Sequence, residues 1–325
     1  MTLALLFPGQ GSQEPGMLHT LPPSPAVTAT LAEADDVLAE LAWSGDLDTV
    51  AALRDTTAVQ LALVIAGVAC ARALTNDYGL TNDDLTNDDG LLPAFVAGHS
   101  VGAFSAAVTA GVLTLREALG AVRLRGDLMR EACAGRAWGM AAVTGLPIRA
   151  ARQMAVDVST AAEPLWLANV NSATQTVLSG TTAALAAAEQ AAKTLTARSF
   201  EHLDVSVASH CPLQDGTACQ LAAHLADLPR RSPTARYLTN TGGRSVGTAN
   251  QVLDDLANAV AQPVQWYDAT RLMAELGATV AVQLPPGRVL SQLLRSAAPS
   301  ISSIALSDNG FQDARVMARR ASTSR

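Results

Sequence analysis

The chain has 325 residues, of which 49% are hydrophobic and 16% are charged, so it can form one large globular domain with room for a smaller companion. This composition excludes a disordered chain, and the formal net charge of −7 excludes the dense basic surface that nucleic-acid binding needs. The four cysteines (Cys70, Cys133, Cys211 and Cys219) show no CxxC pair and no metal-ligand spacing, which predicts buried or inert thiols and no metal site.

The first residues, MTLALLFPGQGSQ, contain a short apolar run but lack the basic segment that opens a signal peptide. No apolar stretch is expected to reach the length of about 18 residues that a membrane-spanning helix needs. The sequence therefore predicts a soluble cytoplasmic protein with no membrane contact.

Short apolar strands and longer helices alternate through the first 132 residues. Buried strands are predicted at residues 3–7 and 93–98, and helices at residues 57–74, 101–110 and 115–132. Between them, residues 75–88 contain the tripeptide TND three times and are polar and rich in turn formers. Such a segment predicts an exposed loop.

The pattern changes after residue 133 and resumes near His210. Strands are predicted at residues 139–146, 165–171, 175–180 and 199–207, with helices after Pro147 and at residues 182–196. This βαββαβ order predicts a ferredoxin-like small domain, residues 134–204, inserted into a larger α/β domain. Near the end, residues 278–295 are typical of a strand, a turn and a helix, and the arginine-rich tail beyond Asp308 is expected to fray.

The segment Gly98-His99-Ser100-Val101-Gly102 fits the G-x-S-x-G pattern between a predicted strand and a predicted helix. On such a sharp turn the serine is strained and its hydroxyl is lifted from the sheet edge, while the next helix points backbone N–H groups at a developing oxyanion. Ser100 is the predicted nucleophile, and an ordinary glycine-rich turn is the alternative. The larger domain, residues 1–133 and 205–325, is therefore predicted to be an α/β-hydrolase-like catalytic domain.

A nucleophilic serine needs a base, and histidine is the commonest one. His210 follows the strand predicted to end at Val207, which places it well to reach a site at the sheet edge. His99 adjoins the serine on a tight turn and is expected to point elsewhere. His19, His202 and His224 stay open as alternatives, the last in a run typical of a helix face.

The helix predicted from Leu115 to Met129 places Arg125 within its apolar stripe, whereas Arg123 falls on the opposite face with Asp127 four residues on. A guanidinium that points inward is costly unless it meets an anion. Arg125 therefore indicates either a buried structural salt bridge or a bidentate site for a substrate carboxylate.

Several segments in order resemble one enzyme family, the malonyl-CoA:acyl carrier protein transacylases. These segments are FPGQGSQ (7–13), GHSVGAF (98–104), VRLRGDLM (122–129), GMAAV (139–143), ANVNSATQTVLSG (168–180), SVASHC (206–211) and PVQW (263–266). The resemblance implies transfer of a malonyl group from malonyl-CoA, a substrate, to the phosphopantetheine-type thiol of an acyl carrier protein. It implies no bound cofactor.

The resemblance also implies a role for each matching residue. It makes Ser100 the nucleophile that becomes the malonyl ester, His210 the general base and Arg125 the partner of the malonyl carboxylate. The backbone N–H groups of Gln10 and Val101 would form the oxyanion hole. A backbone carbonyl near Ala259, where the family often has glutamine, would orient the histidine.

Other segments resemble the epsilon subunit of malonate decarboxylase. They are LFPGQGSQEPGMLHTLP, AVQLALVIAGVACARAL and QLPPGRVL, the last with Pro285 before its PG pair. This branch implies that the chain loads the carrier subunit of malonate decarboxylase, with a malonyl transacylase of fatty-acid or polyketide synthesis as the alternative. A serine hydrolase and a non-catalytic subunit that only docks a carrier are the rival functions.

Overall fold

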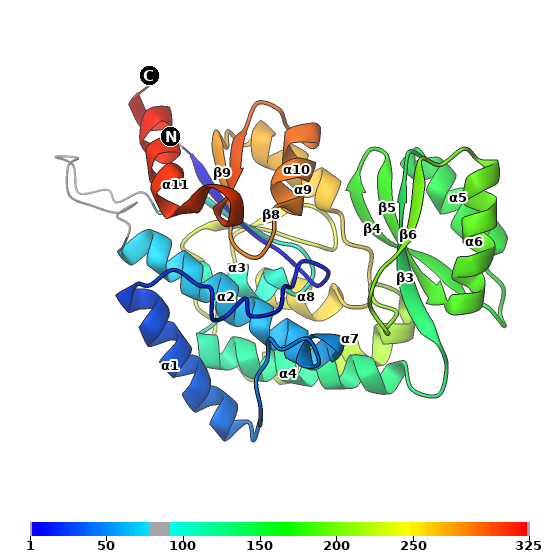
Figure 1. Ribbon diagram of the computed structural model, residues 1–325, viewed down its shortest axis with the longest axis horizontal. Helices are drawn as coiled ribbons and strands as arrows, with labels where there is room; N and C mark the ends of the chain where they lie inside the picture. The colour runs from blue at the N-terminus through cyan, green and yellow to red at the C-terminus, as the bar shows by residue number, and fades with distance from the viewer. Residues whose placement is uncertain (1, 78–91, 324–325) are drawn as a thin grey trace.

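The structure is a computed structural model, and it describes residues 2–77 and 92–323. Most of the predicted TND loop, residues 78–88, therefore lies outside the described residues. The described chain forms two lobes, each built around its own sheet (Figure 1). The fold is the predicted α/β fold with a small ferredoxin-like subdomain.

The larger lobe is formed by the two ends of the chain. Its helices and strands are β1 (Leu3–Phe7), α1 (Pro25–Glu40), α2 (Thr56–Asn76), β2 (Phe95–Gly98), α3 (Gly102–Thr109), α4 (Leu115–Ala132), α7 (Asp215–Ala226), β7 (Arg236–Leu238), β8 (Ser245–Val246), α8 (Ala249–Asn258), α9 (Trp266–Glu275), β9 (Val280–Gln283), α10 (Val289–Ala297), β10 (Ser302–Ala305) and α11 (Leu306–Thr323). The sheet order is β10-β9-β1-β2-β7-β8, and every pair is parallel except β7 with β8.

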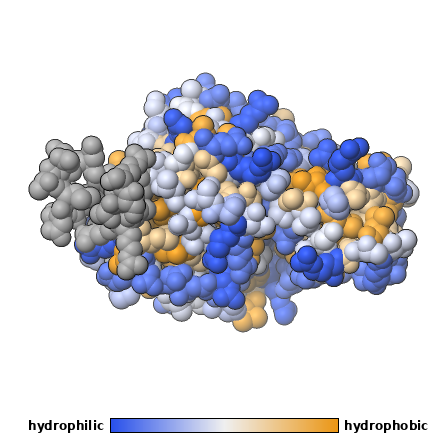
Figure 2. Space-filling view, turned by 90° about the horizontal axis from the view of Figure 1, so that it is seen from above, coloured by the Kyte–Doolittle hydropathy of each residue, from blue (hydrophilic) through white to orange (hydrophobic). Residues whose placement is uncertain are grey.

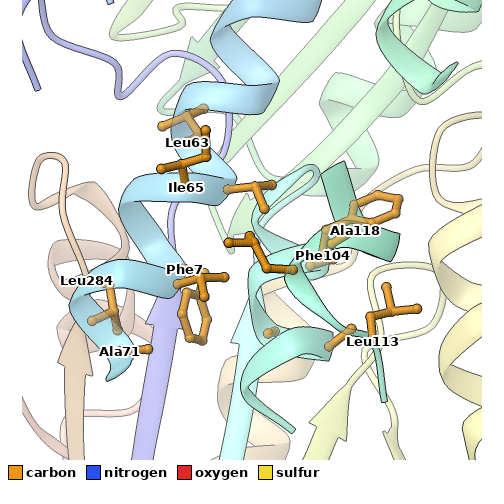
Figure 3. Close-up of a cluster of buried hydrophobic side chains, with 14 of the residues drawn as sticks. Phe7, Leu63, Ile65, Ala71, Phe104, Leu113, Ala118 and Leu284 are labelled. Carbon is orange, nitrogen blue, oxygen red and sulfur yellow. The ribbon is translucent and has the colours of Figure 1, made fainter. Parts of the chain in front are cut away.

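Strand β1 is buried on both faces because it lies in the middle of this sheet. Leu5 and Phe7 pack into a core with α2, α3 and α4, while Ala4 and Leu6 pack with α9 and α10. Figure 3 shows the first core, in which Phe7 lies among side chains of α2 and α3. The alternation fixes the register of β1, and with it the position of the turn that follows β2.

Helix α2 runs through that core. By length and composition it could span a membrane, so the expectation that no apolar stretch is long enough is wrong. However, 94% of its apolar window is buried inside the molecule, as in the core helix of a globular protein. The cytoplasmic location stays a prediction.

The smaller lobe contains β3 (Trp138–Thr144), α5 (Ile148–Val158), β4 (Leu165–Ser172), β5 (Gln175–Thr181), α6 (Thr182–Thr194) and β6 (Ser199–His202). Its antiparallel sheet has the order β4-β5-β3-β6. Helices α5 and α6 lie on the side of this sheet away from the larger lobe (Figure 1). The elements keep the predicted βαββαβ order, and the domain limits at residues 133/134 and 204/205 stay our proposal.

The edge strand β4 is joined to the larger lobe by backbone hydrogen bonds. The N–H of Val170 donates to the carbonyl of Val264 at 2.8 Å, and the N–H of Val264 donates to the carbonyl of Ala168 at 2.9 Å. This parallel contact holds the small sheet against the segment that precedes α9. The face seen from above mixes hydrophilic and hydrophobic residues over both lobes (Figure 2).

Two predicted elements are wrong at the level of local structure. The strand predicted at residues 199–207 ends at His202, because Leu203 donates to the carbonyl of Met140 and Val205 donates back to Leu203, which turns the chain. The tail beyond Asp308 is helical in α11, because Phe311 and Ala314 are buried against the larger core.

Candidate active site

The predicted nucleophile lies on a tight turn between β2 and α3. Ser100 has φ 53°, a left-handed conformation that is costly for a residue with a Cβ. The flanking glycines make the turn sterically possible: a Cβ on Gly98 would lie 2.1 Å from the N of Ala103, and one on Gly102 would lie 2.2 Å from the carbonyl oxygen of Phe7. The turn therefore has the geometry that G-x-S-x-G predicts.

His210 reaches this serine from the segment that returns from the small lobe. Its Nε2 lies 2.8 Å from Ser100 Oγ. Its Nδ1 donates to the carbonyl of Ala259 at the C-terminus of α8, and its backbone N–H donates to the carbonyl of Val260 at 2.7 Å. Because Nδ1 carries the proton in that bond, Nε2 is left with a lone pair that faces the Ser100 hydroxyl.

The surroundings of His210 keep it neutral. Its side chain is buried, with 2% of the residue exposed. Burial and then the positive charge of Arg125 lower the pKa of His210 to about 3, well below its ordinary value of 6.5. A neutral imidazole beside a hydroxyl is the form that a general base requires.

Arg125 points inward from α4, and it too reaches Ser100. Only 3% of the residue is exposed, and its NH2 group donates to Ser100 Oγ at 3.3 Å. Its NH1 group donates to the side-chain carbonyl of Gln60 on α2. Among residues 2–77 and 92–323 no carboxylate forms an ion pair with Arg125, whereas Arg123 on the outer face pairs with Asp127 at 3.2 Å.

The contacts of Arg125 bear on the two interpretations that the sequence left open. A structural salt bridge would need an acidic partner, and the neutral Gln60 occupies that place. Burial lowers the pKa of Arg125 to about 10, so it stays protonated at neutral pH. A buried guanidinium that contacts the Ser100 hydroxyl and pairs with no anion within the described residues has the chemistry to bind an anionic group.

Of the two residues expected to form the oxyanion hole, one belongs to the turn and the other to the segment that follows β1. Val101 is buried directly before α3, and Gln10 follows the strand β1. A Cβ on Gly9 would lie 2.4 Å from the carbonyl oxygen of His99, so the segment of Gln10 packs against the turn. Their role as N–H donors stays a prediction.

His99 points away from the serine, as expected of a neighbour on a tight turn. Its Nε2 lies 3.0 Å from the side-chain oxygen of Asn171 on β4, and its ring makes an edge contact with Trp266. Of the open alternatives, His19 pairs with Asp48 and His202 pairs with Glu189. His210 is the histidine that the structure brings to Ser100.

Sequence reasoning missed two residues at this site. Gln60 has the signal of a single amide in the apolar run TAVQLALVIAGV, and it is fully buried. Asn240 has no such signal, yet its side chain accepts from the backbone N–H of Ser100 at 2.9 Å. Within the part of the chain that the structure describes, no group of three or more His, Cys, Asp or Glu residues is placed to hold a metal ion.

Comparison with known proteins agrees with this geometry. The family model for the acyl transferase domain matches residues 4–318. The malonyl CoA-acyl carrier protein transacylase of Salmonella typhimurium is 33% identical over 307 residues, which cover 94% of this chain and 96% of that protein. The protein of that name from Bacillus subtilis is 30% identical over 311 residues, covering 94% and 93%.

Solved structures give the same result. An acyl-carrier-protein S-malonyltransferase from Burkholderia pseudomallei 1710b has a TM-score of 0.87 at 30% identity, covering 97% of this chain and 100% of that one. A malonyl-transacylase solved in complex with its type II PKS acyl-carrier protein has a TM-score of 0.84 at 30% identity, covering 99% and 100%.

Proposed function

The chain belongs to the malonyl CoA-acyl carrier protein transacylases of the acyl transferase domain family, and from this premise we propose that it moves a malonyl group from CoA to the thiol of an acyl carrier protein through an ester on Ser100. The observation that carries the proposal is the buried Arg125. Its guanidinium lies 3.3 Å from Ser100 Oγ and has no carboxylate partner within the described residues. A malonyl group brings the missing carboxylate to that place.

The first half-reaction forms the ester. His210 Nε2 takes the proton of the Ser100 hydroxyl, and Oγ attacks the thioester carbonyl carbon of malonyl-CoA. The backbone N–H groups of Gln10 and Val101 hold the resulting oxyanion. When the carbon–sulfur bond breaks, the proton on His210 passes to the leaving sulfur, and CoA departs as a thiol.

The second half-reaction returns the enzyme to its starting state. His210 accepts the proton of the carrier thiol, and the sulfur attacks the malonyl ester. The carbon–oxygen bond breaks, Ser100 regains its proton from His210, and the malonyl thioester leaves with the carrier. The shared ester intermediate gives ping-pong kinetics. A serine hydrolase would pass the acyl group to water, so turnover that depends on a thiol acceptor separates the two functions.

The Arg125→Ala variant is expected to lose the preference for malonyl-CoA over acetyl-CoA. Truncation of one partner of a buried charge-paired hydrogen bond costs about 2–5 kcal/mol, and acetyl makes no such bond. Acetyl transfer should change little or rise. The measurement is kcat/KM for both thioesters, and Arg125→Lys should recover only part of the preference because an ammonium cannot bind a carboxylate bidentately.

Arg123→Ala is the matched control on the same helix. Arg123 is partly exposed and pairs with Asp127 on the far face, so neither rate should change. An equal fall of malonyl and acetyl transfer in Arg125→Ala would make Arg125 a structural residue and would remove the argument for a dicarboxylic acyl group.

We further propose that the carrier is the carrier subunit of malonate decarboxylase. The support is the resemblance of the segments around Gln10, α2 and Pro285 to that enzyme's epsilon subunit. The expected result is a higher kcat/KM for that subunit than for the acyl carrier protein of fatty-acid synthesis, measured side by side with malonyl-CoA saturating. A preference for the fatty-acid or polyketide carrier would assign the chain to the alternative branch.

A further inference from the structure

Asn240 binds the backbone of residues 98–100, on the side of the turn where the chain enters it. Its side-chain oxygen accepts from the N–H of Ser100 at 2.9 Å, and its side-chain NH₂ donates to the carbonyl of Gly98 at 3.0 Å. A single planar carboxamide therefore bridges the two peptide groups that flank His99, immediately before the strained Ser100. Asn240 is 3% exposed and lies just after β7, the neighbour of β2 in the sheet.

The buried carboxylate of Asp255 on α8 holds Asn240 in turn. Its Oδ2 accepts from the backbone N–H of Asn240 at 2.9 Å and from the Tyr237 hydroxyl at 3.0 Å. Its Oδ1 accepts from the N–H and the hydroxyl of Thr241, at 2.9 Å and 2.8 Å. No basic side chain within residues 2–77 and 92–323 forms an ion pair with Asp255, which is 3% exposed.

Asp255 also lies at the turn of helix that holds the base. Its backbone carbonyl accepts from the N–H of Ala259 at 2.8 Å, and the carbonyl of Ala259 accepts from His210 Nδ1. One turn of α8 therefore connects to Ser100 through Asn240 and to His210 through Ala259. Asp255 therefore contacts both Asn240, which binds the backbone of Ser100, and Ala259, whose carbonyl accepts from His210.

We propose that Asn240 and Asp255 are positioning residues that keep Ser100 in its left-handed conformation and set the distance between Ser100 Oγ and His210 Nε2. The inference rests on the proposed acylation of Ser100. Neither side chain reaches the reacting atoms, so both act through the backbone. Burying a carboxylate without a cation costs free energy. The hydrogen bonds that offset this cost for Asp255 all come from residues 237–241, the segment that contains Asn240.

The test separates the rate constant of acylation from the fraction of active protein. Asn240→Ala and the isosteric Asp255→Asn are mixed rapidly with malonyl-CoA, and the burst of released CoA is recorded. The burst rate constant should fall about 10- to 100-fold, because an ångström of misplacement at a reacting centre has an effect of that order. The burst amplitude per folded protein and the affinity for malonyl-CoA should stay unchanged, because Arg125 and Gln60 lie on other helices.

Thr241→Val is the matched control, because it removes a hydrogen bond from the other oxygen of Asp255 and leaves Asn240 in place. Its burst rate constant should match that of the unchanged protein. A normal rate constant with a smaller amplitude per total protein in Asn240→Ala and Asp255→Asn would mean that the pair only stabilises the fold, and would overturn the proposal.

A fluorophosphonate that labels activated serines keeps this test independent of the proposed function. If the unchanged protein gives no burst with malonyl-CoA, the proposed function fails. The second-order rate constant of Ser100 labelling then measures the same positioning, and it should fall in Asn240→Ala and Asp255→Asn but not in Thr241→Val. Equal labelling of all four proteins would overturn the positioning role alone.

Discussion

Ser100→Ala is expected to abolish both formation of the acyl-enzyme and transfer of the malonyl group, because the proposed ester forms on the hydroxyl oxygen that the substitution removes. The hydroxyl lies 2.8 Å from His210 Nε2 and 3.3 Å from the Arg125 guanidinium, so its removal takes away the one oxygen that both side chains contact at this turn while leaving the two side chains in place. The measurement is transfer of radiolabelled malonyl from CoA to a carrier protein, with the label retained on the enzyme counted separately.

The variant should fold normally. Alanine at φ 53° has the same Cβ strain as serine, so the substitution adds none, and the two backbone hydrogen bonds of Asn240 are kept. The melting temperature should therefore change by only a few degrees, since the loss of the hydroxyl's hydrogen bonds to His210 and Arg125 costs about 1–3 kcal/mol. If folded Ser100→Ala still carries labelled malonyl, the assignment of the nucleophile is wrong.

His210→Ala is expected to slow transfer by about 100- to 10,000-fold, the usual contribution of a positioned acid–base group. Nε2 is the acceptor nearest the Ser100 hydroxyl, and the carbonyl of Ala259 fixes its tautomer. His99→Ala is the matched control, because that ring binds Asn171 instead and should affect the rate far less. A large loss in His99→Ala with a normal rate in His210→Ala would reverse the assignment.

The pH dependence of acylation tests the same histidine. His210 must be neutral to accept the serine proton. Burial together with the charge of Arg125 lowers the pKa of His210 to about 3 from the ordinary 6.5. A lowered pKa keeps the neutral form to lower pH, so kcat/KM for malonyl-CoA should stay level from pH 8 down to about pH 5. Arg125→Ala removes one of the causes that lower the pKa of His210. In this variant, assayed with acetyl-CoA, the fall of kcat/KM at acidic pH should therefore begin at a higher pH. A fall of kcat/KM centred near pH 6.5, at the same pH with and without Arg125→Ala, would contradict this account.

The sequence predicted the parts of the fold and site that depend on local pattern. Buried strands such as residues 3–7, the helix from Leu115 to Ala132 and the βαββαβ order all follow from periodicity and turn residues. The apolar stripe of that helix placed Arg125 inward without any contact being known. The predicted limits were least reliable where the chain turns away from a sheet, as after His202.

The sequence did not predict contacts made between distant segments. Gln60 meets Arg125 across 65 residues, and Asn240 meets Ser100 across 140, and no local spacing brings these pairs together. The helical tail depends on burial of Phe311 and Ala314 against the larger core, which the arginine-rich pattern of the tail does not reveal. The apolar length of α2 exceeds the sequence-based expectation: the helix has 21 residues, and its one amide within the apolar run, Gln60, is fully buried.

Intact-protein mass spectrometry tests the central claim most directly. The protein is incubated with malonyl-CoA or acetyl-CoA, the adduct is located by peptide mapping, and a carrier protein with its phosphopantetheine-type thiol is then added. The account predicts a malonyl adduct on Ser100 that forms in preference to acetyl and disappears when the carrier gains it. An unmodified protein, an adduct elsewhere, or acetyl carried as readily as malonyl would contradict it.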